Sequence, residues 1–277
     1  FMARRRKKRS FLKFIFVLFV LYFIKTNILA DKALSFPFDF QRFGINSLYK
    51  TDDKTKLRKN IEKQANKGND KARWIYDNFN SLSDTLIYLS GNDSDTIDFV
   101  YNHANGIRDF AYYEGQSYNL DRKTPYFIQW DNRWAYNDLG QSNIGIAGCG
   151  PTSMAMVLSR LTGDPSITPA KIASDAYGYM DGNGIAWSFF KDESNRYGYG
   201  ITDIANDKEA MIDALEYGPL IVSVDRGYFT LFGHILVIDS YQDGKFLIND
   251  PNSIKRSQKK WSYGQIEDQI VHIWLVN

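Results

Sequence analysis

The pattern of apolar and polar residues changes character twice along this chain of 277 residues. Behind a basic cluster, residues 14–24 are apolar without interruption. Residues 53–118 instead place apolar residues at helical spacing, which predicts short helices in "KTKLRKNIEKQANKG" and "KARWIYDNFNSLSDTLIYLSG", and another in "DTIDFVYNHANG" capped by Ser94 or Asp95. Beyond about residue 122, β-branched and aromatic runs alternate with helical segments and glycines. This change predicts a domain boundary, followed by a domain of mixed α and β structure.

The chain is therefore expected to have four segments. Residues 1–30 form a basic tip and a signal peptide or anchor helix, residues 31–52 a tether, residues 53–122 a small helical module, and residues 123–277 the main domain. A signal peptide cleaved after Ala30 and an uncleaved anchor helix both fit the first segment. Its positive charges favour a cytoplasmic tip, so everything that follows is expected outside the cytoplasm.

Charge changes this picture only at the N-terminus. The whole chain has a net charge of +2, but the first thirty residues hold eight basic residues and no acidic one, so the remainder carries −6. The body of the protein is mildly acidic, which gives no reason to expect a nucleic-acid partner. One cysteine also excludes a disulfide within the chain.

That cysteine, Cys149, lies in "AGCGPTS", directly before a predicted helix. Pro151 suits a first helical turn, apolar residues follow at helical spacing, and Gly163 ends the segment. Unpaired N–H groups at a helix N-terminus stabilise a thiolate, so a nucleophilic cysteine is one interpretation. The flanking Gly148 and Gly150 would let a substrate backbone come close. The other interpretation is a buried structural cysteine.

A nucleophilic cysteine needs a basic partner, and the chain has three histidines. His103 lies among polar residues and is expected at the surface, while His272 lies in a C-terminal strand with no acid after it. His234 begins the strand pair "GHILVIDSYQDGKFLIND", which turns at residues 242–244. Such a hairpin brings Asp250 opposite His234 or within a residue or two of it. The resulting pair could orient a catalytic imidazole, or it could be structural.

Cysteine on a helix, histidine on a later strand and an acid after the next strand is the chain order of papain-like enzymes. The motifs "QWDNRWAY", "GIAGCGPTSMAMVLSRLTG", "GHILVIDSY" and "INDPNS" resemble the secreted relatives of the double-glycine-leader cysteine peptidases, cysteine peptidase family 39, over about residues 124–277. Residues 72–102 resemble a helical segment that often precedes this domain in Gram-positive proteins. The resemblance implies an α+β, papain-like fold, with the catalytic helix packed on an antiparallel sheet, after the helical module and the N-terminal membrane segment.

Carried over by position, the resemblance implies that Cys149 is the nucleophile, that His234 is the general base and acid, and that Asp250 orients the histidine. It implies no metal and no cofactor. The sequence agrees with this, because no Cys, His and Asp cluster has zinc spacing and no phosphate-binding glycine motif is present.

The oxyanion donor departs from the pattern of papain-like enzymes, which usually carry glutamine six residues before the cysteine. That position is Asn143 here, and Gln141 lies two residues earlier. Gln129 is a further candidate, and the backbone N–H of Cys149 is expected to contribute.

Four residues are expected at the substrate cleft. Trp187 belongs to the aromatic segment "YGYMDGNGIAWSFFKDESNRYGYG", which could line the cleft or form a packed loop. Gly148 and Gly150 flank the cysteine, and Gly233 precedes the histidine.

Together these features predict an extracytoplasmic cysteine peptidase that hydrolyses peptide or isopeptide bonds through a thioester. Its expected partners are a peptide or cell-wall peptide substrate and, through residues 1–30, the membrane of a Gram-positive-like cell. One alternative is a peptidoglycan amidase or endopeptidase that uses the same triad. The other is a catalytically silent surface-binding module that keeps the fold.

Overall fold

The computed structural model describes residues 48–110, 118–182 and 184–277. The expected signal or anchor helix at residues 1–30, and the tether up to residue 47, lie outside the described residues. Residues Leu48–Asn277 form one compact unit. Among the described ranges, no helix is both long enough and apolar enough to cross a bilayer.

The helical module consists of α3 (Lys54–Ala65), α4 (Asp70–Asp77), α5 (Asp84–Asn92) and α6 (Ile97–Ala104). The side chains of Asp53, Asn69 and Ser83 cap the first three helices by accepting backbone N–H groups. The expected cap of α6 by Ser94 or Asp95 is wrong. Both residues lie in a 3₁₀ turn, η1 (Ser94–Thr96), which leads directly into α6 without a side-chain cap.

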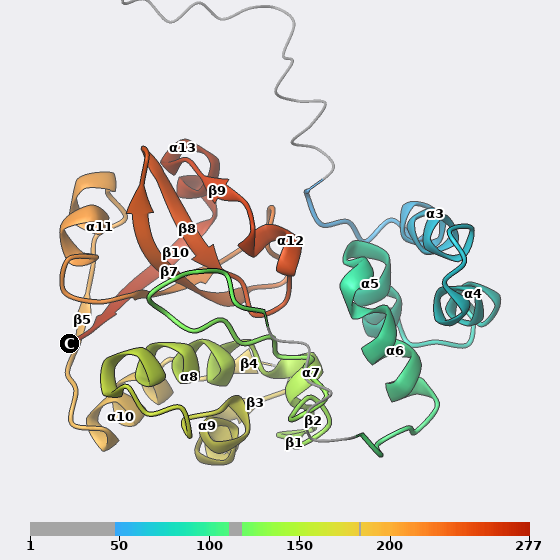
Figure 1. Cartoon of the computed structure of the whole chain (residues 1–277), viewed down its shortest axis with the longest axis horizontal. Helices are drawn as coiled ribbons and strands as arrows, with labels where there is room; N and C mark the ends of the chain where they lie inside the picture. The colour runs from blue at the N-terminus through green and yellow to red at the C-terminus, as the bar shows by residue number, and fades with distance from the viewer. Residues whose placement is uncertain (1–47, 111–117, 183) are drawn as a thin grey trace, which may run out of the picture. The chain divides into compact units, whose positions relative to one another are not determined.

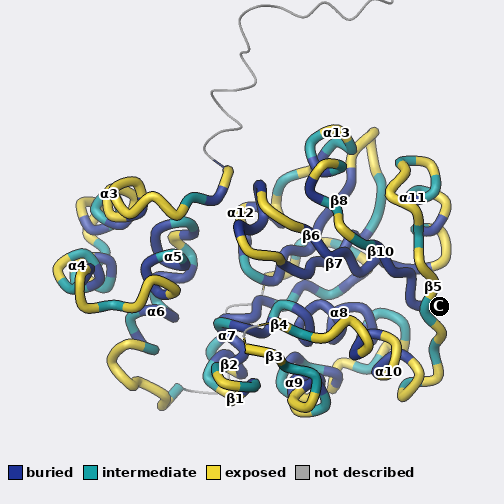
Figure 2. Tube along the Cα trace, turned by 180° about the vertical axis from the view of Figure 1, so that it is seen from behind, coloured by how far each residue is buried: buried dark blue, intermediate teal, exposed yellow. Residues whose placement is uncertain are grey.

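The α+β domain is built on a sheet that has six antiparallel strands in the described part of the chain, in the order β5-β10-β6-β7-β8-β9 (Figure 1). The strands are β5 (Ile201–Asp203), β6 (Leu220–Val224), β7 (His234–Gln242), β8 (Lys245–Asn249), β9 (Lys260–Trp261) and β10 (Ile270–Val276). Every residue of β6 is buried, and the central strands form dark, buried paths in Figure 2. Such a run of buried residues is typical of a strand that is covered on both faces.

The helix α8 (Cys149–Thr162) packs against the central strands β6 and β7. All its residues from Gly150 to Ser159 are buried, and Ser153 Oγ donates to the carbonyl of Ile235 at 3.2 Å. Gly163 ends the helix with a φ of 69°, a left-handed conformation that glycine adopts without strain. The predicted arrangement, a cysteine helix packed on an antiparallel sheet, is confirmed.

Smaller elements complete the α+β domain, and α9 packs on α8. They are β1 (Asp138–Leu139), β2 (Ser142–Asn143), α7 (Ile144–Ala147), α9 (Pro169–Ala176), η2 (Tyr177–Tyr179), β3 (Met180–Asp181), β4 (Gly184–Ile185), α10 (Ser188–Arg196), α11 (Lys208–Ala214), α12 (Ile254–Ser257), α13 (Tyr263–Ile266) and η3 (Glu267–Gln269).

The helical module and the α+β domain share a continuous hydrophobic core. Phe99 of α6 is fully buried, and a Cβ built on Gly145 of α7 would come within 2.4 Å of its ring. Its ring also packs on Tyr136, with ring centroids 5.4 Å apart. Leu48 and Lys50, within the range expected to be a tether, are buried as well. The module is therefore packed against the domain that carries Cys149.

Candidate active site

Cys149 is the first residue of α8, so the thiol lies at the N-terminus of a helix of 14 residues. It is partly exposed, although nearly all the helix behind it is buried. The N-terminal end of the helix dipole favours a thiolate over a thiol at this position. The side chain can therefore meet a substrate while the helix holds it in place.

His234 and Asp250 form a buried hydrogen-bonded pair, with His234 Nε2 and Asp250 Oδ1 2.7 Å apart. The same carboxylate oxygen accepts the backbone N–H of Asn252 at 2.9 Å. Because Nε2 of His234 is engaged by the carboxylate, Nδ1 is the ring nitrogen left for the Cys149 thiol. The structure thus brings Cys149, His234 and Asp250 together: His234 is hydrogen-bonded to Asp250, lines the same cavity as Cys149 and lowers the pKa of its thiol.

A bulge in β7 makes this pair possible. The register between β7 and β8 shifts by one residue at Asp239. Asp250 follows the last paired residue of β8 and therefore lies opposite Leu236, whereas without the shift it would lie opposite Val237. Opposed residues of an antiparallel pair share a face, and faces alternate along a strand. The bulge thus sets Asp250 on the face that His234 shares with Leu236.

The bulge is held from outside the hairpin. Asp239 is buried, and its carboxylate accepts the backbone N–H of Thr124 at 2.7 Å. Arg160 of α8 donates to the carbonyl oxygen of Asp239 at 3.0 Å. The helix that carries the cysteine therefore also fixes the register that positions the histidine.

The electrostatics of the pair favour a thiolate and an imidazolium. Burial lowers the pKa of His234, but the charge and hydrogen bond of Asp250, together with a smaller effect of Cys149, outweigh burial and raise this pKa to about 9. Burial raises the pKa of Cys149, yet the hydrogen bond and charge of His234, with backbone N–H groups of Ile235 and Gly150, bring it below its ordinary value. At pH values between the pKa of Cys149 and the pKa of His234, the expected form is the ion pair of a Cys149 thiolate and a His234 imidazolium.

This charge balance predicts the effect of Asp250→Asn on the pH profile of kcat/KM. The amide cannot stabilise the imidazolium by its charge, so the pKa of His234 falls. The basic limb, expected near pH 9 in the wild type, should move to lower pH by at least about one unit. Hydrolysis of a fluorogenic peptide, followed from pH 5 to pH 10, measures the shift. An unchanged basic limb would show that Asp250 does not set the histidine's pKa.

Cys149 and His234 open into a cavity of about 650 Å³, a size typical of ligand sites. Trp187 and Gly233 line this cavity, but Gly148 and Gly150 do not. Both of those glycines are buried, and a Cβ on Gly148 would come within 2.3 Å of the carbonyl oxygen of Ile144. A Cβ on Gly150 would come within 2.9 Å of the side chain of Ile185, so both glycines leave room for close packing around the cysteine.

The oxyanion candidates are placed differently from one another. Gln129 lines the cavity, and its Nε2 donates to the carbonyl of Gly145 at 3.0 Å. Asn143 instead caps α7 through its Oδ1, and its amide nitrogen lies 3.2 Å from Nδ1 of His103. Gln141 is exposed in the turn between β1 and β2. Among these three side chains, Gln129 is the one placed beside Cys149.

The other histidines also have partners. His103, expected at the surface, is half-buried between Asn143 and the ring of Phe99. His272 Nε2 lies 2.8 Å from Asp203 Oδ1. This acid precedes His272 in the sequence and comes from the neighbouring strand β5, so no motif around His272 indicates it. In the described part of the chain, no cluster of three or more His, Cys, Asp or Glu could hold a metal ion.

Sequence reasoning also missed part of the cavity wall. Tyr88 and Ile87 of the helical module line the cavity, as does Phe232, which precedes Gly233. The signal for Phe232 was present in "LFGHI", where an aromatic residue and a glycine directly precede the candidate base. No local signal places the module residues there, because tertiary packing alone brings α5 to the cavity.

Comparisons with known proteins agree with these motifs. The family model described as peptidase C39-like matches residues 122–276. A comparison with curated proteins finds no match to this chain.

Solved structures give a more distant likeness. The peptidase domain of Streptococcus ComA, a bifunctional ABC transporter of a quorum-sensing pathway, is 16% identical, with 51% of this chain and 97% of that chain covered and a TM-score of 0.37. A double-glycine-motif protease from an AMS/PCAT transporter, solved with its leader peptide, is 16% identical (50% and 88% covered, TM-score 0.36). A protein described as a C39-like peptidase, from Bacillus anthracis, is 14% identical, with 56% of this chain and 94% of that chain covered and a TM-score of 0.34. At these TM-scores the likeness carries no argument about the site.

Proposed function

We propose that Cys149, His234 and Asp250 act as a catalytic triad in this chain, which belongs to the peptidase C39-like family and is a cysteine peptidase. The thiolate of Cys149 attacks the carbonyl carbon of the scissile bond. The imidazolium of His234 gives its proton to the leaving amine, and a thioester remains. His234 then takes a proton from water, which attacks the thioester and releases the acid and the thiol. Asp250 holds the ring and its charge throughout.

The observation that carries this proposal is the hydrogen bond between His234 and Asp250 at a cavity of about 650 Å³ that Cys149 and His234 both line. The developing oxyanion needs N–H donors at the cavity side of the thiol. Gln129 is suited to be one of these donors. The second hydrogen of its side-chain amide has only a long contact of 3.4 Å, to the carbonyl of Ile146, and so is available to an oxyanion. The backbone N–H of Cys149, at the helix N-terminus, is the second donor in this proposal.

The reactivity of the thiol tests the triad without any peptide substrate. At pH 6, Cys149 should react with iodoacetamide at least about tenfold faster than free cysteine, because the neighbouring imidazolium maintains the thiolate. His234→Ala should bring the rate to that of free cysteine. His272→Ala is the matched control, since it removes another Asp-paired histidine, and should leave the rate unchanged. Slow alkylation of the wild type would contradict the triad.

The proposed location is extracytoplasmic, with residues 1–30 as a membrane anchor or a cleaved signal peptide. The basic cluster and apolar run in the sequence support this proposal. Substrates available there include exported peptides and the peptide or isopeptide bonds of cell-wall cross-bridges. Protease accessibility of the protein on intact cells tests the location, and protection from added protease would contradict it.

A further inference from the structure

We propose that the helical module forms one wall of the substrate cleft, and that Tyr88 and Phe232 together hold a large apolar side chain of the peptide beside the scissile bond. The proposal rests on the function proposed above and names its substrate class. It assigns the module a direct part in substrate recognition. A spacer would have no such part.

The cavity that contains Cys149 and His234 is lined by both parts of the structure. The module contributes Leu57 from α3 and Ile87, Tyr88 and Leu89 from α5. The α+β domain contributes Phe229, Phe232 and Trp187, among others. Substrate that reaches the thiol therefore has the module on one side, and most of the large side chains around it are apolar.

An aromatic pair joins the two sides. The rings of Tyr88 and Phe232 have centroids 5.6 Å apart and are tilted by 59°, within the range of favourable ring pairs. Phe232 is 73% exposed and lies two residues before His234. Its exposed ring, which borders the cavity, offers apolar surface that a substrate side chain could cover.

The chain is shaped to present this ring. Gly233 has a φ of 95°, and nothing lies within 4 Å of the position that its Cβ would occupy. This left-handed conformation, which glycine adopts without strain, turns the chain between exposed Phe232 and buried His234. Thr230 Oγ1 fixes the turn, accepting the N–H of Phe232 at 3.0 Å and donating to the carbonyl of Gly233 at 3.0 Å.

The charged residues that the module, and Asp52 just before it, bring to the cavity are already paired. Lys54 Nζ lies 2.8 Å from Asp84 Oδ1, and Asp52 Oδ2 lies 4.0 Å from Arg226 Nη2. These are exposed pairs at the edge of the cavity, each of little energetic worth. The surface left for a substrate side chain is therefore the apolar one, which favours residues such as Leu, Phe or Tyr over Asp, Lys or Ser.

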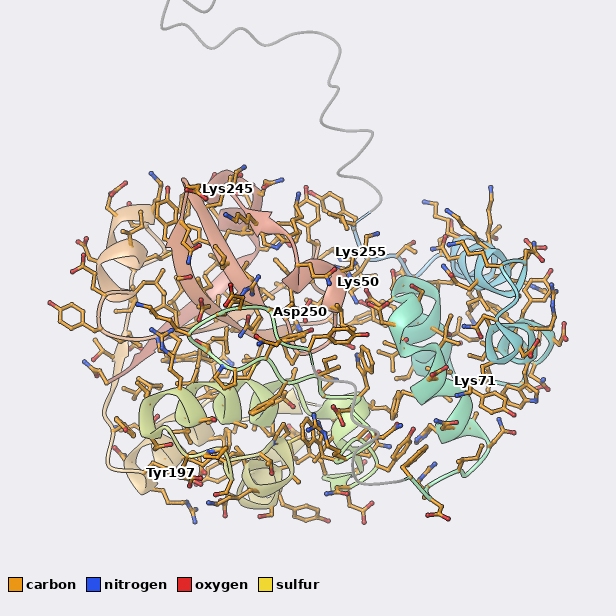
Figure 3. All side chains as sticks on the ribbon, in the orientation of Figure 1. Lys50, Lys71, Tyr197, Lys245, Asp250 and Lys255 are labelled. Carbon is orange, nitrogen blue, oxygen red and sulfur yellow. The ribbon has the colours of Figure 1, made fainter. Side chains whose placement is uncertain are left out.

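The wall is also anchored close to the triad. Asp93, the C-cap of α5, accepts hydrogen bonds from Arg256 of α12 at 2.5 Å and from Ser253 at 2.9 Å, and pairs with Lys50. Figure 3 shows Lys50 between α12 and α5. The backbone N–H of Ser253 donates to the carbonyl of Asp250 at 3.2 Å. The end of α5 and the acid of the triad are thus fixed to one short segment.

Binding to the full chain carrying Cys149→Ala tests the wall independently of turnover. The probes are capped hexapeptides that carry Phe, Leu, Ser, Asp or Lys at one varied position. The Cys149→Ala protein should bind the Phe and Leu peptides at least about tenfold more tightly than the Asp and Lys peptides. Adding Tyr88→Ala or Phe232→Ala should remove most of this preference. The loss of affinity for the Phe and Leu peptides in the variant with both changes should be smaller than the sum of the two separate losses.

Tyr101→Ala is the matched control, since it removes an aromatic ring of the same module that packs on Trp74 away from the cavity. It should leave the peptide preference unchanged. Equal losses of the peptide preference in Tyr88→Ala, Phe232→Ala and Tyr101→Ala would overturn the proposal. The absence of any preference in the Cys149→Ala parent would overturn it too. Cleavage by the wild type is scored separately. Selective binding without cleavage would reject the proposed hydrolysis and keep the wall, whereas cleavage with no side-chain preference would reject only the wall.

Discussion

Replacing Cys149 with serine should lower kcat/KM for peptide hydrolysis by about 10⁴-fold or more while the protein stays folded. A hydroxyl beside an imidazole ionises far less readily than a thiol. The neighbouring charges that lower the pKa of Cys149 are tuned to a thiolate and cannot make an alkoxide at neutral pH. Initial rates on a peptide identified from a cleavage library, measured beside the wild type, give the loss.

The chain itself supplies a strong control for this experiment. Cys149 is its single cysteine, so inactivation of the wild type by iodoacetamide has one possible thiol target. Thermal unfolding and peptide binding should be close to wild type in Cys149→Ser, because the change affects one partly exposed atom. Residual hydrolysis within tenfold of the wild type would mean that another residue is the nucleophile.

Features that depend on neighbours in sequence could be predicted. Pro151 and Gly163 mark the first turn and the end of α8, and the structure begins and ends the helix accordingly. The turn of the β7–β8 hairpin was also readable, because Asp243 and Gly244 both have positive φ values, of 53° and 74°. Helix ends and tight turns are decided by local backbone preferences, which a single sequence contains.

The bulge at Asp239 could not be predicted in the same way. Nothing in "GHILVIDSYQ" distinguishes a regular strand from a bulged one. The bulge is held by Thr124 and Arg160, which are far from it in sequence. Counting residues from the turn of the hairpin predicts that Asp250 lies within two residues of the position opposite His234. Whether the two side chains lie on the same face of the sheet depends on the bulge, and so on the contacts of Thr124 and Arg160 with Asp239.

The cleft illustrates the same limit. The helical module could be predicted from its periodicity and caps, yet its contribution to the cavity depends on buried contacts such as Phe99 against Gly145. Gln129 was one of three candidate donors at the sequence level. Its place in the cavity comes from its fold neighbours, since its backbone N–H donates to the carbonyl of Pro251, just after Asp250, at 2.8 Å. Long-range packing therefore decides which polar residues meet the thiol.

Asp93→Asn should lower the free energy of unfolding by about 3–5 kcal/mol. Asp93 is 4% exposed and faces two buried cations, Lys50 and Arg256, which are 6% and 2% exposed. Burial raises its pKa, but the two cations and their hydrogen bonds bring the pKa down to about 2. An amide there would leave both cations buried without a counter-charge. Urea unfolding followed by tryptophan fluorescence at pH 7 measures the change.

Asp98→Asn is the matched control for this loss, because Asp98 belongs to the same module and pairs with Lys71 at 3.4 Å in solvent. Its cost should stay below about 1 kcal/mol. A pKa below the unfolded value means that Asp93 stabilises the fold above about pH 4, and that this contribution is lost as the pH falls towards about 2. Asp93→Asn should therefore unfold with a shallower dependence on pH across that interval. A cost equal to that of Asp98→Asn would show that the cluster does not hold the module, and the rigid wall beside the triad would lose its physical basis.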